Sequence, residues 1–466
     1  MKFLIRKSFK ITLFLVISTL LLFSSTANNQ NSTQLKISVH HPEWSYNSTI
    51  YEVNIRQFTK EGTFKAFAKH LPRLKKLGVD ILWLMPLNPI GKKNRKGKLG
   101  SYYSVRDYKG INPEFGNKDD FKNLVNEIHK NDMHVIIDWV ANHSAWDNIW
   151  VKTHPDYYTK DKRGNFVSPV PDWTDVIDFD YSNKRLWNAM ADAMQYWVKE
   201  FDIDGFRCDV AAMVPTEFWA FVRPQLDKLK HVFMLAEANE PYLHQVFDMT
   251  YNWQLKDLFN GIAKGEKSVN DIYKYLNEEK TNYPPDAFRM NFTSNHDENT
   301  WNGTVFERLD GAAEISAVFA CLIPGMPMIY NGQEAGLNKR LSFFDKDIIK
   351  WKQSKFENIY KTLFHEKHVN QALFNGSKSG KLNLIKTNNK NIFAFERNKN
   401  GDRILGIFNF TAEGQTFTMA KNTFNSKLED IFTTQTFKLD KDRVMKLPAW
   451  GYRVLSNRTL IKADRL

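Results

Sequence analysis

The stretch Asp138-Trp139-Val140-Ala141-Asn142-His143 places an acid, an amide and a histidine directly after the run His134 to Ile137, which is mostly apolar and β-branched. Three later segments also contain or follow apolar or β-branched runs: Gly205-Phe206-Arg207-Cys208-Asp209, Ala236-Glu237-Ala238-Asn239 and Asn295-His296-Asp297. A parallel barrel gathers the carboxyl ends of its strands on one face, so carboxylates far apart in the sequence can converge there. The four segments therefore predict a parallel barrel with an acidic site on one face.

Strand-like and helix-like runs alternate along the chain, which indicates βα units and a parallel sheet. Eight strands are expected, at residues 50–55, 81–85, 134–140, 205–210, 232–236, 247–252, 287–293 and 326–330. Helices are expected at residues 64–77, 118–130, 185–200, 216–230, 269–279, 312–322 and 356–368. This α/β pattern predicts a (β/α)8 TIM barrel.

The length of 466 residues exceeds what one hydrophobic core usually fills, so at least two domains are expected. Hydrophobic residues at 42% and charged residues at 25% are ordinary for a folded globular chain. We assign the barrel to residues 45–370, including a short insertion at 142–182 after the third strand. Short alternating runs and the turn signal Asn400-Gly401 predict a C-terminal β-sandwich at residues 371–466.

Residues 1–27 have the pattern of a signal peptide, with basic residues, an apolar run at 11–23 and then small residues up to Ala27. The run is shorter than the roughly 20 residues of an ordinary membrane span, which favours cleavage over an uncleaved anchor. We expect export to a periplasm or the medium, without stable membrane insertion. N-terminal sequencing of exported protein should find a start near Asn28, and a start at Met1 would contradict this.

The formal net charge is +13, and part of it lies in one short segment. The basic residues of this segment are Lys92, Lys93, Arg95, Lys96 and Lys98. Such a run could bind nucleic acid or another anionic surface. The glycines at 91, 97 and 100 favour a solvated loop instead, so no nucleic-acid partner is expected.

The chain has two cysteines, Cys208 and Cys321. Cys208 lies between Arg207 and Asp209 on a predicted strand, so it must face the outer helices if those two side chains face the barrel centre. Cys321 falls in the helix expected at residues 312–322, on another side of the barrel. We therefore expect two buried free thiols and no disulfide.

The four opening segments resemble the signature regions of the α-amylase family, the retaining α-glucan hydrolases and transferases, and the resemblance covers roughly residues 45–455. It implies that Asp209 is the nucleophile and Glu237 the acid/base, about 5 to 5.5 Å apart. By the same resemblance, Asp297 is the third carboxylate, which binds sugar hydroxyls and stabilises the transition state.

The resemblance also implies four substrate-binding residues, namely Tyr103, His143, Arg207 and His296. Arg207 would orient the nucleophile and keep it ionised. Tyr102 is the main competitor for the sugar-stacking role of Tyr103. Asp138 is expected to be structural, and Trp301 could line a subsite or be buried by packing.

Many members of the family carry a structural calcium ion between the barrel and the loop after the third strand. Asn142 and Asp172 are the matching oxygen ligands in this chain. The histidine whose carbonyl completes the site in the family is replaced by Met213, which weakens the case without excluding calcium. We expect calcium, if bound at all, to be structural and weakly held. No organic cofactor is expected.

The expected activity is hydrolysis of α-1,4-glucosidic bonds in starch-like glucans or maltooligosaccharides through a covalent glycosyl-enzyme intermediate. The alternatives within the family are a hydrolase active on α-1,6 bonds, on trehalose or on sucrose, and a relative that transfers the glycosyl group to another sugar. A non-enzyme alternative is a barrel that serves as a partner of a membrane transporter. Such partners lack the carboxylate triad and keep an anchor, which does not match Asp209, Glu237 and Asp297 here.

Overall fold

The computed structural model of the protein describes residues 39–419, 427–437 and 443–458. Eight parallel strands form a closed barrel in the order β1-β10-β9-β8-β7-β6-β3-β2. Their bounds are β1 Ile50–Val53, β2 Ile81–Leu84, β3 His134–Trp139, β6 Gly205–Cys208, β7 Phe233–Ala236, β8 Met249–Tyr251, β9 Phe288–Asn291 and β10 Met326–Tyr330. The predicted TIM barrel is confirmed.

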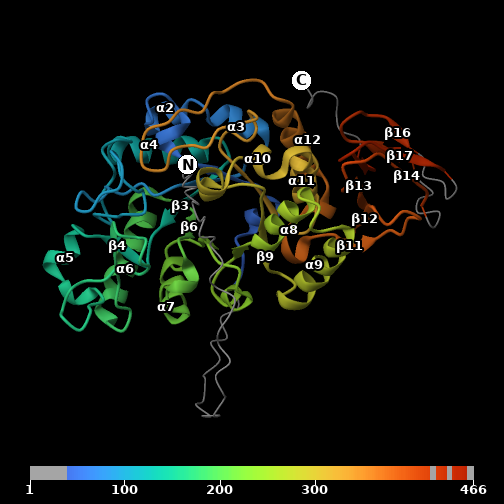
Figure 1. Cartoon of the computed structure of the whole chain (residues 1–466). Coiled ribbons are helices and arrows are strands. Elements are labelled where there is room, and N and C mark those ends of the chain that lie inside the picture. The colour runs from blue at the N-terminus through green and yellow to red at the C-terminus, as the bar shows by residue number, and fades with distance from the viewer. Residues whose placement is uncertain (1–38, 420–426, 438–442, 459–466) are drawn as a thin grey trace, which may run out of the picture. The chain divides into compact units, whose positions relative to one another are not determined.

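Helices follow the barrel strands and pack outside them (Figure 1). Their bounds are α1 Ile55–Phe58, α2 Phe64–Ala68, α3 Leu71–Leu77, α4 Lys118–Lys130, α6 Lys184–Phe201, α7 Thr216–Asp227, α8 Trp253–Ala263, α9 Val269–Asn282, α10 Val305–Leu309, α11 Ala313–Leu322 and α12 Lys355–Val369. The outer core is formed by the apolar faces of these helices and the outward side chains of the strands.

One helix prediction was wrong, and helix α8 was missed. The single helix expected at residues 64–77 is two, α2 and α3, because Pro72 lies in the first turn of α3 and has no N–H to continue the hydrogen bonds of α2. Helix α8 was not predicted, although Asn252 caps it by accepting a hydrogen bond from the N–H of Leu255.

Alternation along the strands decides which side chains enter the barrel. Ile50, Ile81 and Ile136 belong to the inner cluster. The side chains two residues further on point the same way, so Glu52 and Asp138 also face inward, near the carboxyl ends of the strands. Cys208 packs in the outer cluster, and both cysteines are buried and free, as predicted.

The insertion after β3 is small. Strand β4 (His143–Ala145) pairs antiparallel with β5 (Val176–Asp178), and the helix α5 (Ile149–Thr153) lies between them in the sequence. The predicted segment 142–182 thus contains little more than one two-stranded sheet and short helical turns.

The C-terminal strands form a six-stranded sheet, β11-β12-β13-β18-β15-β16, and a two-stranded sheet, β14-β17. Their bounds are β11 Lys381–Leu384, β12 Ile392–Lys399, β13 Asp402–Asn409, β14 Gln415–Phe417, β15 Leu428–Asp430, β16 Thr436–Phe437, β17 Met445–Leu447 and β18 Tyr452–Ser456. Ile407, Phe417 and Leu447 share a core between the two sheets, so the predicted antiparallel sandwich is confirmed. Asn400 and Gly401 both have positive φ and make the expected tight hairpin turn.

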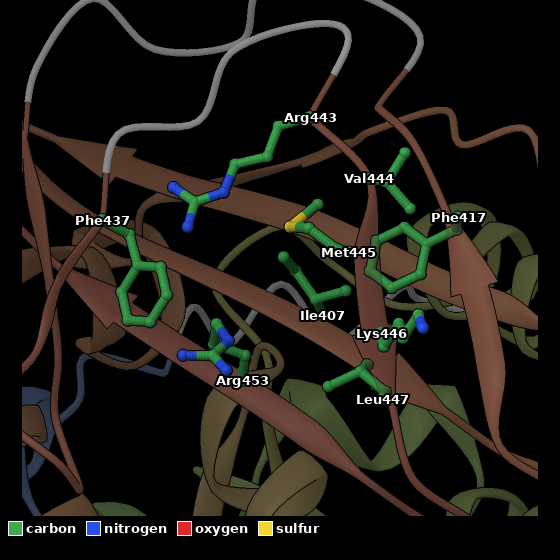
Figure 2. Close-up of a pocket in the computed structure, with 9 residues that line it drawn as sticks. All are labelled: Ile407, Phe417, Phe437, Arg443, Val444, Met445, Lys446, Leu447 and Arg453. Carbon is green, nitrogen blue, oxygen red and sulfur yellow. The ribbon is translucent and has the colours of Figure 1, made fainter.

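A cavity of about 160 Å³ lies between these C-terminal strands. Figure 2 shows Arg443 and Arg453 near Phe437, with Phe417 and Met445 across from them. Its lining contains no carboxylate or histidine, so it offers no acid/base pair.

The barrel and the sandwich are joined by direct contacts. Phe319 of α11 packs edge-on against Phe393 and Phe408, and Arg397 donates a 2.7 Å hydrogen bond to the carbonyl of Leu322. Helix α12 ends at Val369 and β11 begins at Lys381, on either side of the boundary predicted at residue 370. The proposed signal peptide at residues 1–27 lies outside the described residues. Among the described helices, none is long and apolar enough to cross a membrane.

Candidate active site

Arg207 lies at the centre of the acidic cluster. Its Nη1 is 2.8 Å from Asp138 Oδ1 and 2.9 Å from Asp209 Oδ1. Its Nη2 is 2.9 Å from Glu237 Oε1, an ion pair without the alignment of a hydrogen bond. Arg207 is fully buried, so one desolvated guanidinium brings together carboxylates from β3 and from the ends of β6 and β7, which are neighbouring strands.

A strained residue links the predicted nucleophile to the predicted acid/base. Val210, directly after Asp209, has φ 37° and ψ 48°, the left-handed region that a β-branched residue rarely adopts. This turn directs the N–H of Val210 to Glu237 Oε2 at 2.8 Å. Strain of this kind persists where the surrounding structure over-determines it, as at active sites.

Burial raises the pKa values of both predicted catalytic carboxyl groups. The pKa of Glu237 rises to about 7, because burial and the charges of Asp209 and Asp297 outweigh the opposing effect of Arg207. Burial and the charge of Asp138 raise the pKa of Asp209 to about 6. Near neutral pH these carboxyl groups can hold opposite states, with Asp209 ionised and Glu237 protonated.

Asp297 lies beside a buried histidine cation. Asp297 Oδ2 is 3.4 Å from His296 Nε2, and Glu52 Oε1 is 2.5 Å from His296 Nδ1. Burial alone would lower the pKa of His296, but the charges of Asp297 and Glu52 raise it to about 9. His296 is therefore an imidazolium at neutral pH, and both ring nitrogens can donate hydrogen bonds.

Tyr103, rather than Tyr102, reaches this cluster. Tyr103 Oη is 2.8 Å from His296 Nε2 and donates to Asp138 Oδ2 at 3.1 Å. The ring of Tyr102 packs instead under the guanidinium of Arg56, 4.1 Å from ring centroid to Arg56 Cζ. Asp138 accepts hydrogen bonds from Arg207, Tyr103 and the indole of Trp83. These bonds hold the four side chains in fixed positions relative to one another.

Three residues at the site were not predicted from the sequence: Glu52, Trp83 and Tyr251. Trp83 donates to Asp138, and Tyr251 Oη accepts a 3.0 Å hydrogen bond from Arg207 Nε. Glu52 could have been found from the sequence. It lies two positions after Ile50, whose side chain faces the barrel interior, and side chains two positions apart on a strand face the same side.

Asn142 and His143, the first two residues of the insertion, contact each other, and His143 also packs near Trp173. Asn142 Nδ2 is 3.3 Å from His143 Nδ1, and the His143 ring lies 5.3 Å from the ring of Trp173. Burial lowers the pKa of His143 to about 3, so its imidazole is neutral. Substrate binding by His143 stays a prediction.

Calcium binding by Asn142 and Asp172 stays a prediction, and a lysine already contacts the backbone carbonyl of Asp172. The carbonyl of Asp172 accepts a 2.6 Å hydrogen bond from the ammonium of Lys96, which also lies 3.3 Å from Asp175 Oδ1. In the part of the chain that the structure describes, no group of three His, Cys, Asp or Glu side chains could hold a metal ion. Calcium takes about six to eight oxygen ligands, so Asn142 and Asp172 do not fit strong binding. Lys96, a member of the basic loop at residues 92–98, thus pairs with a carboxylate of the insertion.

We therefore expect EDTA to lower the melting temperature by about 2 °C or less and to leave hydrolysis at about 25 °C intact, since little stability depends on bound metal. Lys96→Ala should lower the melting temperature more than Lys98→Ala, because Lys96 bridges to the insertion. Thermal denaturation of the unmodified protein with and without EDTA measures the first shift in melting temperature. The same measurement on the two lysine variants gives the second shift, and a hydrolysis assay with EDTA measures activity. If EDTA stops hydrolysis at once and added calcium restores it, the insertion depends on the ion and the expectation is wrong.

The fold and the site together define a class of protein: a barrel glycoside hydrolase with carboxylates at the carboxyl ends of its strands. The model of the α-amylase catalytic domain matches residues 23–176 and 171–372, and that of the maltogenic amylase C-terminal domain matches residues 382–454. The chain belongs to the α-amylase family.

Known relatives agree with this assignment. A maltogenic α-amylase from Thermotoga neapolitana is 31% identical, with a TM-score of 0.81 over 89% of this chain and 99% of that one. The α-amylase MalA of Haloarcula japonica is 24% identical over 83% of this chain, and α-amylase 2 of Dictyoglomus thermophilum is 26% identical over 72%. The chain spans 59% and 66% of the lengths of these last two relatives.

Proposed function

We propose that this protein is a retaining hydrolase of α-1,4-glucosidic bonds in starch-like glucans or maltooligosaccharides. One observation carries the proposal: Asp209 and Glu237 lie against the same buried guanidinium and have pKa values raised to about 6 and about 7. The names of relatives support the substrate class, since they include α-amylase, maltogenic α-amylase and cyclomaltodextrinase.

In the first step, protonated Glu237 gives its proton to the glycosidic oxygen while Asp209 attacks the anomeric carbon and forms an ester. The leaving sugar departs, and Glu237, now a carboxylate, takes a proton from water. That water breaks the ester and restores both carboxyl groups. Arg207 balances the negative charge that moves between the two residues, because it contacts both. Asp297, whose charge contributes to the raised pKa of Glu237, and the cationic His296 beside it are suited to bind sugar hydroxyls.

The proposal predicts that the first product of maltooligosaccharide hydrolysis is the α-anomer, since two displacements retain configuration. NMR of the earliest turnovers reports the anomer before mutarotation. A β-anomer would exclude the double displacement. Product analysis on starch, pullulan, maltotriose and trehalose identifies the linkage and separates hydrolysis from transfer.

Transfer is a second candidate because a maltosyltransferase from Picrophilus torridus is also similar, with 26% identity over 84% of this chain. Longer oligosaccharides among the maltotriose products would support transfer. The third possibility, a non-catalytic transporter partner, predicts no release of reducing sugar from starch. We also propose export through the signal peptide, with the mature N-terminus near Asn28 as its test.

A further inference from the structure

Glu52 is a buried acid that the proposed mechanism does not use. It lies on β1 and is 0% exposed, so it has no surface to offer a substrate. Its Oε1 is 2.5 Å from His296 Nδ1, and its Oε2 has no hydrogen-bond partner among the described residues. A buried polar atom without a partner is costly, so the presence of an acid here calls for an explanation.

His296 connects Glu52 to the other side chains of the site. On the far side of the imidazole, Nε2 is 2.8 Å from Tyr103 Oη and 3.4 Å from Asp297 Oδ2. Tyr103 in turn donates to Asp138 Oδ2 at 3.1 Å, and its ring stacks on that of His296 with the centroids 5.4 Å apart. One imidazole thus joins β1 to residues that follow β2 and β9.

The protonation of His296 decides the direction of these hydrogen bonds. An imidazolium donates from both ring nitrogens, so Nε2 donates to Tyr103 Oη and the tyrosine proton is left for Asp138. A neutral imidazole that donates to Glu52 through Nδ1 can only accept at Nε2. The Tyr103 hydroxyl would then turn to His296, and the carboxylate of Asp297 would face a ring nitrogen without a proton.

The charges around His296 favour the imidazolium. Burial lowers the pKa of His296, and so does the positive charge of Arg207 on β6. The negative charges of Asp297 and Glu52, with the hydrogen bond to Glu52, outweigh both effects and raise this pKa to about 9. Burial also raises the pKa of Glu52, and the charge of His296 opposes that rise, because the two groups stabilise each other as an ion pair.

We propose that Glu52 is a positioning residue, which keeps Nε2 of His296 a hydrogen-bond donor. Through that nitrogen it holds Tyr103 and Asp297 in the arrangement that the substrate meets. This inference rests on the proposed function. It requires the charge of Glu52 and not only its shape, since a glutamine could still accept the hydrogen bond from Nδ1.

Glu52→Gln tests the role of this charge. The pKa of His296 should fall in the variant, because one of the charges that raise it is removed. The variant should therefore lose the His296 proton as the pH rises, at a pH where the unmodified enzyme still keeps it. Its kcat/KM on a maltooligosaccharide should be roughly 10-fold lower than that of the unmodified enzyme at pH 8, and the difference should shrink as the pH falls. The ratio isolates this effect, because Asp209 and Glu237 titrate in both enzymes.

NMR of the histidine carbons measures the protonation of His296 without relying on activity. Its signal is the one that is absent from His296→Gln. In the unmodified enzyme His296 should stay mostly protonated up to pH 8, and in Glu52→Gln it should be neutral at that pH. The loss of kcat/KM in Glu52→Gln should follow the fraction of His296 that is neutral at each pH.

Asp80→Asn is the matched control. Asp80 also pairs with a histidine, at 2.7 Å from His368 Nε2, but it directly precedes β2 and so lies at the opposite end of the barrel from the site. This variant should have the kcat/KM of the unmodified enzyme at both pH 6 and pH 8.

Two results would overturn the inference while the proposed function stands. One is a His296 that stays protonated at pH 8 in Glu52→Gln, and the other is a kcat/KM that does not follow the neutral fraction. A neutral His296 in the unmodified enzyme at pH 7 would also overturn it, even if the variant failed to fold. If the unmodified enzyme hydrolyses no maltooligosaccharide, the proposed function fails, and NMR still tests the effect of Glu52 on His296.

Discussion

Asp209→Asn should lower kcat on a maltooligosaccharide by about 10⁴-fold or more, because an amide cannot attack the anomeric carbon and form the glycosyl ester. The fold should persist. Asparagine keeps the shape of the side chain, and Arg207 retains its ion pairs with Asp138 and Glu237. Steady-state kinetics measure the loss, and circular dichroism with thermal denaturation measures the fold.

Asp192→Asn is the control for loss of a negative charge. Asp192 is exposed and pairs with Lys109 at 2.5 Å, outside the site, so its amide variant should keep full activity. A second measurement does not depend on how the variant folds. A 5-fluoro glycosyl fluoride should trap the ester on the unmodified enzyme, and mass spectrometry should find the label on Asp209. Near-normal activity of Asp209→Asn, or a label on another residue, would disprove the assignment.

The sequence predicted the barrel well because its signals are local. Each inner strand is a short apolar run, and the acidic residues at the strand ends mark one face. The sequence did not predict the break between α2 and α3, where Pro72 outweighs an uninterrupted apolar stripe. It also missed α8, whose cap depends on one side-chain hydrogen bond from Leu255 to Asn252.

The candidate site residues were predicted one by one from sequence motifs. The residues that were missed do not belong to any of these motifs. Glu52, Trp83 and Tyr251 act through contacts with residues of other strands, over sequence separations that the pattern of one strand does not reveal. Lys96 contacts oxygen atoms of Asp172 and Asp175 in the insertion, because two loops meet there. The hydrophobic pattern of the sequence does not show which loops meet. The pKa values likewise arise from burial and from charges that converge only in the fold.

Glu237→Gln should have an effect that depends on the leaving group. On starch, kcat/KM should fall by about 10² to 10⁴-fold, because glutamine cannot protonate the departing oxygen. On α-maltosyl fluoride the formation of the glycosyl-enzyme should be much less affected, since fluoride departs with little help from an acid. Rapid-quench kinetics separate this step from the later hydrolysis, which also needs Glu237 as a base. Glu240→Gln, three residues away, should leave both substrates unaffected.

The pH profile gives an independent check with a definite sign. Activity needs Asp209 ionised and Glu237 protonated, so kcat/KM should fall below pH about 6 as Asp209 gains its proton and above pH about 7 as Glu237 loses its own. The two limbs report apparent pKa values of the pair and not of either residue alone. The two carboxyl groups repel each other when ionised and both contact Arg207, so their titrations are coupled. In Glu237→Gln the alkaline limb should disappear, while the acidic limb remains. If the alkaline limb persists and starch and maltosyl fluoride lose activity equally, Glu237 holds the substrate in place and another group supplies the proton.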